Sequence, residues 1–126
     1  MPISHIHSVA FLALDALSVH IEVDISESPD KLSLVIVGLP DTAVKESKDR
    51  VLAAIKNSGY PVKNLHCTIN LAPGNLKKEG TLYDLPIAMG LLSTLGHVED
   101  RLYQDFLIMG EMGLSGKTRP IRGALA

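Results

Sequence analysis

The fold of this chain is decided at a strand-to-helix corner in residues 32–44, which read LSLVIVGLPDTAV. The almost wholly apolar run over residues 32–37 predicts a strand that lies centrally in a sheet. Gly38 then relaxes the backbone and Pro40 fixes its φ angle, which lets the chain change direction. Asp41 is expected to cap the free N–H groups at the start of the helix that follows.

Two helices are predicted from the spacing of apolar residues. Apolar side chains recur at helical spacing over residues 42–58, and Gly59 with Pro61 forms a strong stop signal after them. Residues 85–95 carry apolar side chains almost all the way round, so we expect this second helix to be well buried. Gly96 is expected to end it.

The strands on either side follow from alternation. Residues 18–25 alternate polar and apolar side chains, which predicts a strand with one solvent-exposed face and one buried face. Across a turn at residues 26–30, we expect it to pair antiparallel with residues 32–37. Residues 66–71 predict a further strand. The apolar face of the first strand consists of Val19, Ile21, Val23 and Ile25.

A hairpin is predicted near the end of the chain, with residues 106–110 and 118–121 as its arms. The turn between them contains Gly116-Lys117-Thr118, which looks like the tail of a phosphate-binding loop. That loop requires another glycine five residues before the Gly-Lys pair and a helix after it. Glu111 occupies the glycine position and Pro120 follows, so a hairpin turn is favoured over a nucleotide site.

Composition excludes several classes of protein. The chain has 126 residues, of which 46% are hydrophobic and 21% charged, as in one soluble globular domain. Aromatic residues make up 4% and tryptophan is absent, which argues against modules that stack bases on aromatic platforms. The N-terminus lacks a cationic signal region and early apolar runs are too short to span a bilayer, so we expect a cytoplasmic protein without membrane contact.

Charge is distributed unevenly along the chain. Residues 1–41 hold one lysine against six acidic residues, whereas residues 42–78 hold seven lysine or arginine residues against two acidic ones. Two adjacent lysines, Lys77 and Lys78, precede the second helix, whose N-terminus Asp84 could cap. These lysines are the first candidates for phosphate contacts, although a solvated charged loop is the alternative. The next candidates are Lys45, Lys48 and Arg50.

No metal or catalytic constellation stands out. His5 and His7 would share a strand face, but no clustered carboxylate or cysteine completes a metal site, so structural histidines are favoured. Cys67 is the single cysteine and has no local positive group, which favours an inert core thiol. We find no nucleophile elbow of the Gly-x-Ser-x-Gly type.

Six segments, in order over nearly the whole chain, resemble the N-terminal domain of the YifB/ComM family of magnesium-chelatase-like AAA+ proteins. They are residues 35–47, 57–60, 69–73, 77–80, 83–88 and 110–116. The resemblance implies an α+β fold of the ribosomal-protein-S-five domain-two-like, Lon-protease-like type, a two-layer sandwich with a mixed sheet and two main helices. The residues of its structural motif would be Gly38, Pro40, Asp41, Gly80 and Asp84.

The resemblance also implies a function for the whole protein. Residues 1–126 would be a single domain that continues past Ala126 and precedes an AAA+ module, which binds ATP and magnesium. ComM members are bacterial hexameric helicases linked to branch migration of DNA during natural transformation. The implied partners are the AAA+ module, neighbouring protomers of a homo-hexamer and DNA, and these 126 residues need no cofactor of their own.

A Lon-type peptidase can be tested on the residues themselves. The serine nucleophile of Lon-type proteases aligns with Leu82 in this sequence. The side chain of leucine has no atom that could attack a carbonyl. We therefore expect a non-catalytic accessory domain that contributes to DNA engagement or hexamer assembly. The alternative is a purely structural or protein-interaction scaffold without DNA contact, and a degenerate peptidase comes third.

Overall fold

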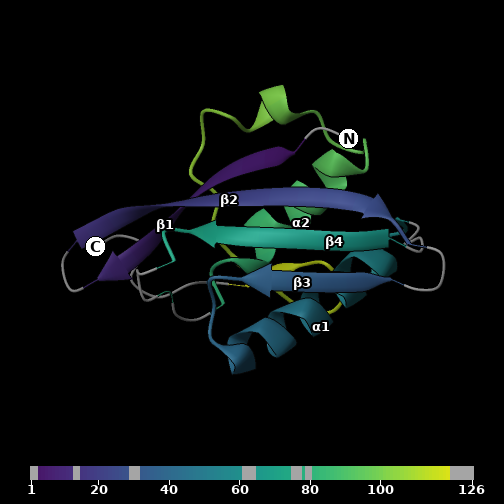
Figure 1. The fold of residues 1–126 in the computed structure, drawn as a ribbon, viewed down its shortest axis with the longest axis horizontal. Coiled ribbons are helices and arrows are strands. Elements are labelled where there is room, and N and C mark those ends of the chain that lie inside the picture. The colour runs from purple at the N-terminus through teal and green to yellow at the C-terminus, as the bar shows by residue number, and fades with distance from the viewer. Residues whose placement is uncertain are drawn as a thin grey trace.

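A four-stranded mixed sheet is covered on one face by two helices in the computed structural model (Figure 1). The structure describes residues 3–12, 15–28, 32–60, 65–74, 78 and 81–119. The predicted α+β class, with a mixed sheet and two main helices, is confirmed. The elements are β1 (Ser4–Leu12), β2 (Asp15–Glu27), β3 (Ser33–Val37), α1 (Asp41–Asn57), β4 (Leu65–Ala72), α2 (Asp84–Thr94), the short 3-10 helix η1 (Asp100–Leu102), β5 (Glu111–Met112) and β6 (Thr118–Arg119).

The order of the strands differs from the prediction. The sheet runs β1-β2-β4-β3, with β2 antiparallel to both β1 and β4 and with β3 parallel to β4. The expected antiparallel pairing of β2 with β3 is therefore wrong, because β4 lies between them. The expected central place of β3 is also wrong. β3 is an edge strand whose Val35 and Val37 are 41% and 50% exposed. The apolar run was misleading because valine favours strands on exposed as well as on buried faces.

The connection from β3 through α1 to β4 has an uncommon hand. The two strands are parallel neighbours, and α1 lies behind the sheet in the view of Figure 1. Seen from the helix side with both strands pointing up, β4 lies to the left of β3, which makes the crossover left-handed. About 98% of such connections in proteins are right-handed. The corner at Gly38 and Pro40 thus starts a connection that few folds use.

The hydrophobic core lies between the sheet and the helices. The predicted inward face of β2 is confirmed, since Val19, Ile21, Val23 and Ile25 are all buried. Every second residue of β3 and β4 is buried on the same side as well. Helix α2 is buried along most of its length, as predicted. It lies close against the sheet at Gly90, where an added Cβ would lie 2.5 Å from Val23 Cγ2.

Helix α1 begins at Asp41, so Pro40 and not Asp41 is the residue that precedes its first turn. The Pro40 carbonyl accepts a hydrogen bond from Val44 N at 3.0 Å. The side chain of Asp41 lies outside the described residues, so its predicted capping role stays a prediction. The helix ends at Asn57, and Gly59 follows with a φ of 91°, which agrees with the predicted stop.

The predicted hairpin turn is confirmed, but its first arm is displaced. Strands β5 and β6 pair antiparallel, and Gly113 N donates to Lys117 O at 2.7 Å across the turn. The expected arm at residues 106–110 instead lies against β1, where Ile108 N donates to His7 O at 2.8 Å. Among the described residues, no helix combines the length and apolar composition that a bilayer-spanning helix needs.

Candidate functional site

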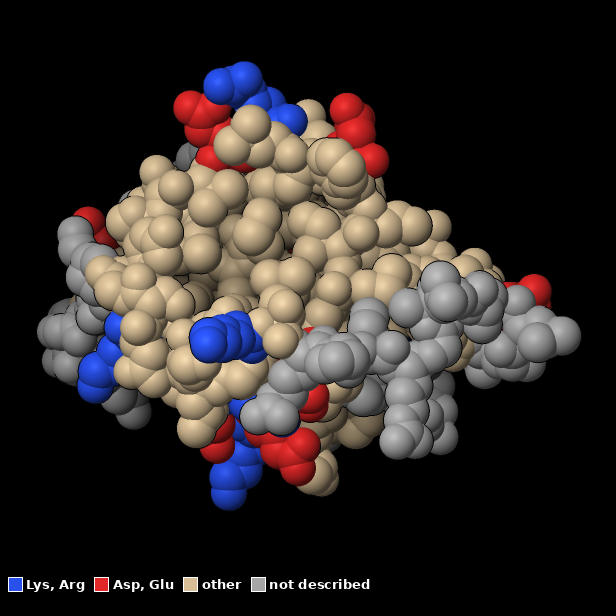
Figure 2. All heavy atoms as spheres, turned by 180° about the vertical axis from the view of Figure 1, so that it is seen from behind, with Lys and Arg blue, Asp and Glu red and all other residues tan. Residues whose placement is uncertain are grey.

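The outer face of α1 carries three lysines. Lys45 and Lys56 are exposed and Lys48 is half-buried. Their helical spacing places them along one side of α1. We refer to Lys45, Lys48 and Lys56 as the lysine stripe. Asp49 is exposed on the same side, so the three lysines and this aspartate together have a net charge of +2. Seen from the helix side, most of the surface is uncharged and the charged side chains lie largely toward its margins (Figure 2).

Arg50, the fourth basic residue of α1 singled out from the sequence, points elsewhere. Its Nε donates to Asp84 Oδ2 at 2.6 Å and its Nη2 to Asp84 Oδ1 at 3.1 Å. Such a two-point ion pair is geometrically specific. The hydrogen bond with Asp84 raises the pKa of Arg50 above its usual value, and this effect is partly opposed by burial. The half-buried guanidinium is therefore engaged by the buried carboxylate of Asp84.

Asp84 is the centre of a polar network in the core. Its side chain is 1% exposed. Besides Arg50, it accepts hydrogen bonds from Ser47 Oγ at 2.9 Å and from the backbone N–H of Met112 at 3.3 Å. Asp84 is the first residue of α2, but Tyr83 stands at the cap position and no side chain there makes a cap hydrogen bond. Its carboxylate instead joins α1, α2 and β5.

Of the two adjacent lysines before α2 that were candidates for phosphate contacts, the structure describes only Lys78. Lys77 and Gly80 lie outside the described residues, so their predicted roles stay predictions. Lys78 is 1% exposed, and its Nζ donates to Pro73 O at 2.5 Å. Burial lowers the pKa of this ammonium. The side chain of Lys78 thus supports the loop from inside and is not presented to a phosphate at the surface.

Gly38 allows the change of chain direction that the sequence predicted at the corner between β3 and α1. Its φ is 103°, a region that residues with a side chain rarely adopt. A Cβ at this position would lie 2.3 Å from the backbone oxygen of Leu71. The end of β3 therefore passes so close to β4 that only glycine fits.

Three histidines form a stack on the uncovered face of the sheet. The ring of His20 stacks on His5 at 5.0 Å and on His7 at 5.4 Å, with interplanar angles of 22° and 16°. His5 Nδ1 and His20 Nε2 lie 3.0 Å apart, within hydrogen-bond distance. The shared face of His5 and His7 was predicted, but His20 was missed. His20 joins the other two rings because it pairs with His7 in the β1–β2 register, a pairing that the sequence alone did not reveal.

The stacked rings do not converge on a metal. Within the described part of the chain, no group of three or more histidine, cysteine or acidic residues could hold a metal ion. The stack is therefore an aromatic surface.

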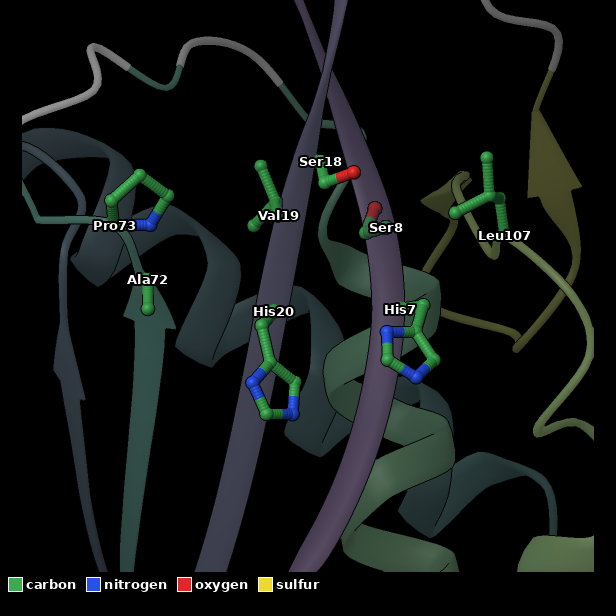
Figure 3. Close-up of a pocket in the computed structure, with 8 residues that line it drawn as sticks. All are labelled: His7, Ser8, Ser18, Val19, His20, Ala72, Pro73 and Leu107. Atoms are coloured by element: carbon green, nitrogen blue, oxygen red, sulfur yellow. The ribbon is translucent and has the colours of Figure 1, made fainter.

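A cavity of about 370 Å³ opens beside two of these rings (Figure 3). It lies over the β1–β2 pair, with Ala72 and Pro73 at the end of β4 on one side and Leu107 on the other. His7 and His20 stand at its lower side in the figure, below the hydroxyl groups of Ser8 and Ser18. The other residues that line it are apolar: Val19, Ala72, Pro73 and Leu107.

Cys67 is expected to be unreactive in the folded protein. It is buried in β4, and burial raises the pKa of its thiol to about 11. Because the thiolate is the reacting species, a chromogenic disulfide reagent at pH 8 should react roughly 100-fold more slowly than with the unfolded chain. The rate of thiol release with and without guanidinium measures this. Equal rates would contradict the buried, protonated state.

The class of protein follows from comparison with known sequences. Residues 21–126 match the family described as subunit ChlI of Mg-chelatase. The chain belongs to this magnesium-chelatase-like family, which agrees with the resemblance found in the sequence.

The similar proteins are bacterial and longer. Over 126 residues, the chain is 42% identical to the uncharacterized protein YifB of Escherichia coli (strain K12). It is 38% identical over 125 residues to the uncharacterized protein Rv2897c of Mycobacterium tuberculosis, and 37% identical over 127 residues to the competence protein ComM of Haemophilus influenzae. These alignments take in 99–100% of this chain and 24% of each relative. The chain thus spans about a quarter of the length of the curated relatives it matches.

Proposed function

We propose that this chain is the non-catalytic N-terminal accessory domain of a bacterial magnesium-chelatase-like AAA+ ATPase, and that it engages DNA through the lysine stripe of α1. The whole protein would be a cytoplasmic, ComM-type helicase that binds ATP and magnesium downstream of this domain and works as a homo-hexamer. The observation that carries the DNA role is the exposure of Lys45 and Lys56 on one side of a single helix. The competence protein ComM among the relatives supports the functional class.

The stripe has the length and chemistry for phosphate contacts. Lys45 and Lys56 are eleven residues apart, which corresponds to about 17 Å at 1.5 Å per residue. The rise of DNA is about 3.4 Å per nucleotide along one strand, so the stripe could follow about five phosphates. Lysine ammonium groups neutralise phosphates without reading bases, and the resulting affinity falls as salt rises. Binding would thus be independent of base sequence.

The non-catalytic part of the proposal is supported by the position that aligns with a peptidase nucleophile. Leu82 packs partly buried against the core, and its carbonyl accepts a hydrogen bond from Gly110 N at 2.7 Å. A leucine cannot form an acyl intermediate. The domain would therefore contribute binding and assembly surfaces to the ATPase.

The DNA role is tested by charge reversal with a matched control. In the double variant Lys45→Glu/Lys56→Glu, the affinity for a duplex should fall at least about 10-fold, and the slope of log affinity against log salt should decrease by roughly 2. Fluorescence anisotropy at several salt concentrations measures both. The control variant Arg101→Glu/Lys117→Glu changes net charge equally at two exposed positions outside α1. An equal loss in the two variants, or no loss at low salt, would overturn the proposed stripe.

A scaffold without DNA contact is the second candidate. It is favoured by large apolar side chains that are exposed to solvent in the segment that follows α2. Leu102, Phe106 and Leu107 are 60%, 63% and 61% exposed. Exposed apolar groups of this size commonly mark contacts with another protein surface. Their partner would be the AAA+ module or a neighbouring protomer. If neither double variant changes the binding of DNA, this candidate replaces the first.

A further inference from the structure

Residues 99–107, which we call the post-α2 segment, expose apolar side chains although their backbone is held in place. Tyr103 is buried in the middle of the segment, and its hydroxyl donates to Ser93 Oγ of α2 at 2.8 Å. At the end of the segment, Ile108 N donates to His7 O of β1 at 2.8 Å. The exposed leucines and phenylalanine of the segment therefore stand on an ordered backbone, so little conformational entropy would be lost when a partner covers them.

The post-α2 segment is also acidic. Its exposed residues Glu99, Asp100 and Asp105 stand against one basic residue, Arg101, so three negative charges and one positive charge give a net charge of −2. Helix α2 has no basic residue in its last turn. Thr94, where α2 ends, lines the same cavity as Glu99 and Asp100, so the negative end of the helix dipole lies beside these carboxylates. An apolar surface with this charge is complementary to a basic one.

The lysine stripe of the same chain lies near the opposite edge of the sheet. The post-α2 segment is bonded to β1, which is the first strand in the order β1-β2-β4-β3, whereas β3 is the last. The stripe is next to β3, because Leu52 stands four residues from both Lys48 and Lys56 and lines a small cavity together with Leu34 of β3. In Figure 1, α1 and β3 lie at the bottom and the green turn of η1 lies at the top. The two surfaces of one molecule therefore cannot meet each other.

The two surfaces match in charge and in chemistry. The net charge of −2 on the post-α2 segment is opposite to the net charge of +2 that the lysine stripe has together with Asp49. The aliphatic part of a lysine side chain can cover exposed leucine, and its ammonium group can lie over the ring of Phe106. The exposed Val35 and Val37 of β3 add apolar area beside the stripe.

We propose that the post-α2 segment of one copy of this chain docks on the lysine stripe and the β3 edge of a second copy. A contact between two different surfaces leaves one surface of each kind free, so further copies can add and close a ring where the rotation permits. The proposal gives one occupant to the exposed apolar residues on which the scaffold candidate rests. It also makes docking and DNA binding mutually exclusive at the lysine stripe.

Photo-crosslinking tests this contact directly. In isotopically labelled intact protein, Phe106 is replaced by the photoreactive residue p-benzoylphenylalanine, and this protein is mixed with unlabelled natural protein in the absence of DNA. After illumination, mass spectrometry should find unlabelled peptides from α1 or β3 attached at position 106. A crosslink between labelled and unlabelled peptides can form only between two copies.

A charge swap then tests which surfaces meet. Glu99→Lys/Asp105→Lys in the photoreactive copy should lower the yield of these crosslinks roughly 10-fold, because like charges then face each other. Mixing the same photoreactive copy with Lys45→Glu/Lys56→Glu protein should restore the yield, because the charges are again opposite. Recovery also shows that both variants are folded.

The matched control is Asp24→Lys/Glu27→Lys in the photoreactive copy, which makes the same change of charge at two exposed positions of β2. It should leave the yield unchanged. The proposal would be overturned by crosslinks confined to the labelled copy, by crosslinks to a part of the protein outside residues 1–126, by no recovery after the charge swap, or by an equal loss in the control. Since no DNA is present, each of these results is independent of whether the lysine stripe binds DNA.

Discussion

Replacing Asp84 with alanine is expected to lower the free energy of unfolding by about 3–5 kcal/mol, the range for breaking a buried ion pair by removing one partner. The carboxylate accepts hydrogen bonds from Arg50, Ser47 and the backbone of Met112. Without it, the Arg50 guanidinium would remain half-buried beside an empty space, and the Ser47 hydroxyl would lose its partner. Equilibrium unfolding in urea measures the loss.

A matched control for Asp84 is available in the neighbouring helix. Asp49→Ala removes an exposed carboxylate from α1 and should change the free energy of unfolding by no more than about 0.5 kcal/mol. Arg50→Met combined with Asp84→Leu removes both charges and should recover part of the loss, because the desolvation of the ion pair is then also removed. A loss below about 1 kcal/mol for Asp84→Ala would show that the network contributes little.

Gly38→Ala is expected to be the second strongly destabilising change. An alanine at a φ of 103° is strained by about 1–3 kcal/mol. Its Cβ would also be forced to within 2.3 Å of the Leu71 oxygen, and relieving such overpacking costs about 1–3 kcal/mol more. The free energy of unfolding should therefore fall by the sum of the two effects, measured as for Asp84.

Gly59 separates the two contributions at Gly38. Its φ is 91°, but an added Cβ would meet nothing within 4 Å. Gly59→Ala therefore carries the conformational strain alone, and the difference between the two variants gives the cost of the close approach to β4. If both variants lose the same amount, the β3–β4 contact at this corner is looser than the structure indicates.

Local features of the fold could be predicted from the sequence, but the pairing of distant segments could not. The helices, the inward face of β2 and the turn at Gly116 depend on residues close together in the chain. The order of the strands depends on β4, which enters between β2 and β3 only after a helix has intervened. Alternation and propensity contain no information about that insertion, so β3 was assigned to the centre of the sheet.

The candidate site shows the same division. Lys45 and Lys48 could be placed on the outer side of α1 from helical spacing, because that spacing is a local property. The roles of Arg50 and Asp84 depend on a contact between residues 34 positions apart. The buried Lys78 side chain likewise makes a tertiary contact, with the carbonyl of Pro73. A charged residue in a sequence carries no sign of whether tertiary structure will enclose it.

The network at Asp84 also has a mechanical consequence. A single carboxylate ties the helix that carries the lysine stripe to the helix that fills the core and to the strand of the terminal hairpin. Helix α1 cannot rotate or slide without breaking hydrogen bonds at the centre of the molecule. If α1 binds DNA as proposed, force applied to Lys45 or Lys56 would therefore pass through Asp84 into α2 and β5.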